Sequence, residues 1–236
     1  MKKICRRNAV ALCALPFIGC SIQPLGPLRS STINDQVTLH LMLPPHIGKS
    51  WTYKVINHYN GYVLDTICET VTELEPVIRI SRESSTRGKL DDEIQNGWGF
   101  IKQEPTWEIL QVYENAVPVW PQNLSLGIKE QYSTHYFANQ GSFGYWISFI
   151  STVSSFERLE LEIGTFDTIK IDKLIRLGHP NTTRTNLIRR ETLWLAPSIG
   201  RWVVKETNGS YVVPGRRPYE GREDHLRWVL TSYSTT

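Results

Sequence analysis

Alternation of apolar and polar residues, rather than helical spacing, dominates this chain. In 51–59 and 62–74 aromatic and β-branched residues alternate with polar ones, which is the period of a half-buried β-strand. Similar segments follow at short intervals marked by turn residues. The further expected strands are 37–43, 77–82, 98–102, 107–113, 116–120, 132–137, 145–153, 159–163, 169–177, 187–195, 202–206 and 226–230. The pattern predicts one all-β domain, an antiparallel open barrel or curved half-barrel sheet of about ten strands.

The sharpest local signal is Asn60-Gly61, which predicts a two-residue hairpin loop with Gly61 at positive φ. Such a loop fixes the register and places Tyr53 opposite Cys68 on the core side. There the Cys68 thiol should behave as a small apolar group. The other face is expected to meet solvent; it carries Thr52, Lys54, His58, Asp65 and Glu69.

The first residues have the pattern of a secretory leader. Basic residues in 2–7 precede an apolar run over 9–18, about half of the roughly 20 residues that span a bilayer. A signal peptide is therefore expected rather than a transmembrane helix.

The end of the apolar run, Phe17-Ile18-Gly19-Cys20, resembles the lipobox of bacterial lipoproteins. The resemblance implies that the Cys20 thiol is acylated and becomes residue one after cleavage; the alternative is an ordinary signal peptide with a chance cysteine. It divides the chain into a signal peptide (1–19), a lipid anchor with a flexible tether (20–36) and a β-sheet domain (37–236). Ser21 resembles residues that allow sorting to an outer membrane, which suggests its periplasmic face.

Cleavage would change the charge of the protein. The chain carries 26 Lys+Arg against 23 Asp+Glu, a formal charge of +3, and four of the basic residues lie in the leader. The mature domain would be slightly acidic, so nucleic acid is not an expected partner. Cys68 would be the one unmodified cysteine, which excludes an internal disulfide.

Three segments, 43–53, 164–170 and 193–203, carry the motifs G-x-x-W-x-Y, G-T-F-D-T and W-x-A-P-x-x-G. They resemble families of exported envelope proteins of unknown function with a curved antiparallel sheet. That sheet is similar to the half-barrel of lipoprotein and lipid carriers, whose concave face holds acyl chains. The motifs themselves are structural, because glycine and proline shape turns and tryptophans can pair across strands.

Candidate chemistry is sparse. The six histidines lack metal-ligand spacing and no catalytic motif is present, so we expect no catalytic residue, no metal, no cofactor and no enzyme activity. Lys173 falls on the apolar face of 169–177, which leaves three interpretations: a bulge near Asp172-Lys173 turns it outward, its stem snorkels from the rim, or it meets the anionic headgroup of a groove ligand. Arg216 and Arg217 are candidate ligand contacts; the alternative is a solvated loop.

The function predicted from these features is that of a non-enzymatic, membrane-anchored envelope lipoprotein. Its curved sheet would bind a hydrophobic ligand or a peptide segment. The alternative is a structural or assembly lipoprotein that serves as a platform for another envelope protein, and a hydrolase of envelope polymers is the third hypothesis. An open apolar groove or a filled interior would discriminate between them.

Overall fold

The computed structural model describes residues 27–33, 42–139 and 141–234, and their regular structure is almost entirely β-strand. The strands are β1 (Arg29–Thr32), β2 (Ser50–Asn57), β3 (Val63–Glu73), β4 (Ile78–Ser84), β5 (Gly88–Lys89), β6 (Glu93–Gly97), β7 (Phe100–Glu104), β8 (Gln111–Pro118), β9 (Lys129–Ala138), β10 (Gly144–Leu161), β11 (Gly164–Leu177), β12 (Thr185–Ala196), β13 (Arg201–Val213), β14 (Tyr219–Arg222) and β15 (Leu226–Tyr233). A single 3-10 turn, η1 (Pro197–Ile199), joins β12 to β13.

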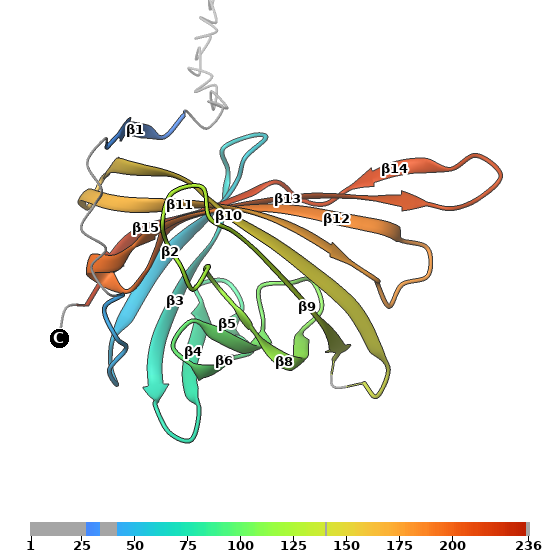
Figure 1. The fold of residues 1–236 in the computed structure, drawn as a ribbon, viewed down its shortest axis with the longest axis horizontal. Coiled ribbons are helices and arrows are strands. Elements are labelled where there is room, and N and C mark those ends of the chain that lie inside the picture. Colours follow the sequence, from blue (N-terminus) through green and yellow to red (C-terminus); the bar gives the residue numbers. More distant parts are fainter. Residues whose placement is uncertain (1–26, 34–41, 140, 235–236) are drawn as a thin grey trace, which may run out of the picture.

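The sheet closes into an antiparallel barrel of twelve strands (Figure 1). Its order is β10-β11-β12-β13-β15-β2-β3-β4-β6-β7-β8-β9, and β9 pairs back onto β10. The predicted all-β, antiparallel class is confirmed. The prediction of an open barrel or half-barrel was wrong, because β9 and β10 are hydrogen-bonded from Phe137 with Gly144 to Lys129 with Thr152. The sequence pattern also did not predict short strands such as β6.

The β2–β3 hairpin has a different register from the predicted one. Its loop contains four residues rather than two, since the Asn57 N–H donates to the Tyr62 carbonyl and the Gly61 N–H to the Asn57 carbonyl. An extra residue in β3 at Leu64 then shifts the pairing again. The positive φ of Gly61 (72°) is confirmed, but β3 as a whole is displaced by one residue.

A one-residue shift reverses the two faces of a strand. Cys68 therefore lies opposite Thr52 on the outer face, half-buried, and its predicted core position was wrong. Asp65 and Glu69, which we expected in solvent, point into the barrel with Ile67 and are 6% and 0% exposed.

Some strands extend beyond the barrel. The end of β13, the loop 214–218 and β14 project from it as a two-stranded ribbon, here called the arm (Figure 1). At the opposite end β1 adds to β10 along Glu157–Glu160. The segment 29–32, which the sequence assigned to a flexible tether, is thus paired with the barrel through its backbone.

Large aromatic side chains fill the end of the barrel near η1. Trp51 stacks on Trp98 with ring centroids 6.2 Å apart, and Trp98 meets Trp120 edge-on at 5.9 Å. The Trp51 indole N–H donates to the Ile199 carbonyl of η1 (3.3 Å). We call this filled part the aromatic end. Beyond it the interior also contains buried charged side chains, which makes that region the candidate site.

Candidate functional site

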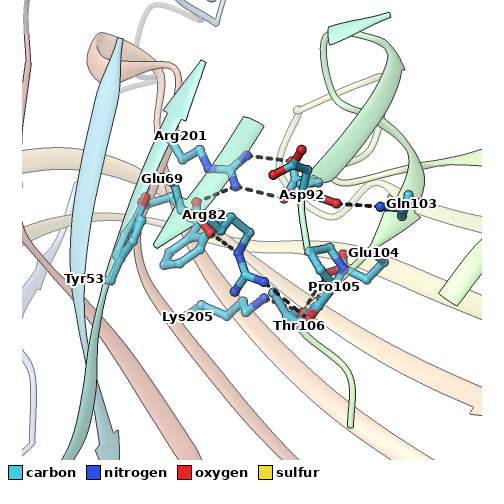
Figure 2. A network of polar contacts seen from close by, with 12 residues as sticks. Tyr53, Glu69, Arg82, Asp92, Gln103, Glu104, Pro105, Thr106, Arg201 and Lys205 are labelled. Carbon is cyan, nitrogen blue, oxygen red and sulfur yellow. Dashed lines mark hydrogen bonds and ion pairs between the residues drawn. The ribbon is translucent and has the colours of Figure 1, made fainter. Parts of the chain in front are cut away.

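Charged side chains from distant strands meet in the middle of the barrel, centred on Arg201. Arg201 opens β13 directly after Gly200, while Glu69 comes from β3 and Glu93 from β6. The Arg201 guanidinium makes two hydrogen bonds to Glu93 (3.0 and 2.9 Å) and one to Glu69 (2.6 Å). Figure 2 shows Arg201 and Glu69 turned toward each other inside the barrel. All three side chains are almost completely buried.

The network continues toward the other end of the barrel. Arg82 of β4 donates to Glu69 (3.2 Å) and to the Pro105 carbonyl (3.3 Å). Beside it Glu191 of β12 forms an ion pair with Lys173 (3.1 Å) and a longer one with Lys205 (3.9 Å). These residues together form what we call the ion layer. Its members are Glu69, Arg82, Glu93, Lys173, Glu191, Arg201 and Lys205.

Electrostatics favour the charged forms of Glu93, Glu191 and Arg201 although these side chains are buried. Burial raises the pKa of Glu93, but the charge and hydrogen bonds of Arg201 outweigh it and hold that pKa below its usual range. For Arg201 burial works against the charge, and Glu69 and Glu93 nevertheless raise its pKa well above the ordinary value. Burial likewise opposes ionisation of Glu191, whose pKa is lowered by Lys173 and Lys205.

Lys173 points into the barrel and is 8% exposed. The predicted alternation is confirmed, since Ile171 and Ile175 lie on the same inner face. The proposed outward bulge was wrong, because β11 pairs with β12 without a register shift from Ile169 to Leu177. The rim position was also wrong: Lys173 lines an internal cavity of about 30 Å³ within the ion layer. That space is large enough for a water molecule.

The end of the barrel away from the aromatic end opens into a cavity of about 850 Å³, here called the end cavity. Its floor includes Arg82, Thr106, Lys205 and Trp228. The walls combine charged, aromatic and a few aliphatic side chains. They include Leu64, Asp65, Ile67, Arg87, Asp91, Trp107, Glu108, Leu110, Arg184, Arg189, Thr207, Tyr211, Arg222, Glu223, Asp224 and Leu226.

Ion pairs connect several of the side chains that form the walls of the end cavity. Arg189 forms a two-bond pair with Glu223 (2.8 and 3.1 Å) and lies over the Trp107 ring, 3.5 Å from its centroid. Arg87 bonds to Asp65 at 3.1 Å. Burial raises the pKa of Asp65, but hydrogen bonds from Ser84 and Arg87 outweigh it and lower that pKa. A carboxylate held ionised in this way cannot serve as a general acid near neutral pH.

Arg216 and Arg217 lie elsewhere. Both are exposed in the loop at the tip of the arm, outside the lining of the end cavity, whereas Lys173 lies inside the barrel. The structure does not bring the three predicted ligand contacts together, and their role in binding stays a prediction. Cys20, the predicted lipidation site, falls outside the described residues.

Arg201, Lys205 and the carboxylates of the ion layer were not predicted as site residues from the sequence. The signal that could have found them is the one noticed at Lys173: an ionisable residue at an inward position of an apolar strand. In β13 Arg201 and Lys205 stand at the two ends of a fully buried run, 201–205, and β12 places Glu191 directly opposite Lys173. Oppositely charged residues at such positions on several strands indicate a buried network.

On the outer face near the mouth, His58, Glu206 and His225 bring potential metal ligands within 4.8 Å of one another. The two imidazoles are stacked, with ring centroids 4.0 Å apart and planes at 5°. Arg227 is bonded to Glu206 and, at 3.0 Å, to His58 Nε2. Because arginine only donates, the His58 Nε2 atom accepts this hydrogen bond. The cluster is an internal contact that joins β13 and β15 to the loop residues His58 and His225.

We expect this contact to weaken in acid. Burial, with the nearby charges of His58 and Arg227, lowers the pKa of His225, although Glu206 partly opposes the shift. Folding therefore favours neutral His225: its stability contribution is present above pH of about 6.5 and is lost as pH falls through the lower folded pKa. Urea unfolding at pH 7.5 and 5 should show a flatter pH dependence for His225→Phe, which keeps an aromatic ring but cannot titrate. An identical pH dependence would contradict this.

Comparison with known proteins gives one structural likeness. No family model and no curated protein sequence matches this chain. The solved structure of the hypothetical lipoprotein YmcC from Escherichia coli (K12) is similar, with 7% sequence identity and a TM-score of 0.44 over 80% of this chain and 86% of that chain. This agrees with the resemblance to envelope lipoproteins of unknown function and is too distant to carry a functional argument. Within the described residues, no helix is long and apolar enough to cross a membrane.

Proposed function

We propose that the protein is a non-enzymatic, membrane-anchored envelope lipoprotein that binds a peptide segment of another envelope protein in its end cavity. The observation that carries this proposal is the character of the cavity: about 850 Å³, open at one end, and lined by charged and aromatic side chains. Peptides offer charged groups, backbone donors and acceptors, and side chains that pack on aromatic rings.

An acyl chain is a poorer occupant. The ion layer closes the barrel below the cavity, so an acyl chain could not extend through the interior without displacing buried ion pairs. In the cavity itself it would cover Arg82 and Lys205, whose hydration it could not replace. The proposal therefore selects the peptide from the two ligand classes that the sequence suggested, and it includes the platform role by making the partner a protein.

Site-specific photocrosslinking in native membranes tests the proposal. A benzophenone amino acid replaces Leu64, which lies in the cavity lining and is 47% exposed; the control replaces Leu126, which is 60% exposed and outside the lining. We expect position 64, and not position 126, to give a discrete adduct whose mass spectrum identifies an extended segment of one envelope protein. A lipid adduct at position 64, or equal adducts at both positions, would contradict it.

The anchor has its own test. Cys20→Ser should abolish acylation and release the protein from the membrane, while the domain still folds because the described barrel is complete without residue 20. Metabolic labelling with a radioactive fatty acid, together with fractionation, measures this. Equal label on the wild type and on Cys20→Ser would rule out the lipidation assignment.

A further inference from the structure

We infer that the floor of the end cavity is an anion subsite, built by Lys205 and Arg82, which receives a negatively charged terminal group of the ligand. The inference rests on the proposed function and deepens it: a peptide would enter with its carboxylate end first. Carboxylate and phosphoryl groups share the required chemistry, and the experiment below distinguishes them.

Lys205 is a buried ammonium with incomplete partners. Its side chain is 7% exposed, yet its closest polar contact is the Thr106 hydroxyl at 3.3 Å, and its carboxylate partner Glu191 is 3.9 Å away. Glu191 also makes the shorter bond to Lys173. An ammonium has three N–H donors, so at least one of them remains to face a ligand.

Arg82 supplies the second cation. Its side chain is 3% exposed, and its Nε and Nη1 donate to Glu69 and Pro105. Within the described part of the chain no hydrogen bond involves Nη2, and this nitrogen is not among the fully buried polar atoms that lack a partner. It is therefore reachable from the cavity that Arg82 lines.

The two cations share a platform. The Trp228 ring lies 5.4 Å from the Lys205 ammonium and 5.8 Å from the Arg82 guanidinium carbon. The carboxylates that balance them, Glu69 and Glu191, line the internal cavity of the ion layer and not the end cavity. The surface that meets the end cavity is thus locally positive. A carboxylate placed there would accept charge-assisted hydrogen bonds of the kind that are about twice as strong as neutral ones.

Calorimetry on the full-length protein in detergent tests the subsite. The probes are N-acetyl-trialanine with a free carboxylate, its C-terminal amide, and inorganic phosphate. We expect the acid to bind at least about tenfold more tightly than the amide, and Lys205→Met to abolish that difference. The matched control Lys129→Met, at an exposed lysine of β9 outside the lining of the end cavity, should preserve it. The wild-type comparison of acid and amide stands on its own even if Lys205→Met fails to fold.

Each result is informative. Phosphate that binds in a Lys205-dependent way and more tightly than the acid would assign the subsite to phosphoryl groups. Acid and amide that bind equally, or no anionic probe that depends on Lys205, would overturn the subsite. That failure differs from failure of the proposed function, which is judged by the crosslink at position 64.

Discussion

Arg201→Met should destabilise the protein by about 3–5 kcal/mol, the cost measured when one partner of a buried ion pair is removed. Arg201 is 2% exposed, and its loss would leave Glu93 and part of Glu69 without a counter-charge inside the barrel. The free energy of unfolding from urea titration gives the value. The size of the effect comes from the stranded carboxylates, not from the packing of the arginine stem.

A compensating variant separates these two causes. Adding Glu69→Gln and Glu93→Gln to Arg201→Met removes the uncompensated negative charge, so part of the lost stability should return. Arg82 would then lose its partner Glu69, which limits the recovery. If the triple variant is no more stable than Arg201→Met alone, the carboxylates are not the cause. A stability within about 0.5 kcal/mol of the wild type for Arg201→Met, the range of ordinary surface changes, would refute the buried network.

Gly200→Ala should produce the second large loss, about 2–4 kcal/mol, from left-handed backbone strain of about 1–3 kcal/mol together with a backbone clash. Gly200 has φ of +71°, and a Cβ atom there would lie 2.2 Å from the Leu43 carbonyl oxygen. The backbone on one side or the other must therefore move. Because Arg201 follows directly, the movement would also disturb the ion layer.

Gly48→Ala is the matched control for this substitution. Gly48 has a similar positive φ of +86°, but nothing lies within 4 Å of the position of its Cβ. Gly48→Ala should therefore show the strain alone and lose clearly less stability, measured by thermal and urea unfolding. Equal losses for the two alanine variants would mean that the contact with Leu43 has no energetic consequence.

Strand existence was predictable because a strand in this barrel has one inner and one outer face. The alternation in 51–57 and in 169–177 is local, so the inner and outer faces of these two strands could be predicted without knowledge of the neighbouring strands. Closure was not predictable in this way. It depends on β9 meeting β10 and on β15 entering between β13 and β2, and no local pattern records which edges meet.

The site was missed for a related reason. The predicted register of β3 was wrong by one residue and therefore placed Glu69 on the surface instead of in the interior. For this reason Glu69 could not be recognised as a partner of Arg201. Charged residues were also assumed to mark outer faces. In this barrel they meet oppositely charged residues from other strands inside, and pairing of that kind becomes visible only when the strands are placed in space. Lys173 was the one position where the sequence itself placed a charged residue on a face predicted to be buried.

The position at which β1 pairs with the barrel affects the orientation of the barrel relative to the membrane. β1 pairs with β10 at Glu157–Glu160, the end that holds the aromatic residues, whereas the end cavity opens at the other end. Eight residues lie between Cys20 and Arg29, so these two residues are at most about 32 Å apart. With Cys20 acylated as proposed, the barrel would stand with its closed end toward its own bilayer. The proposed peptide partner would then approach from the aqueous side of the envelope and not from the bilayer side.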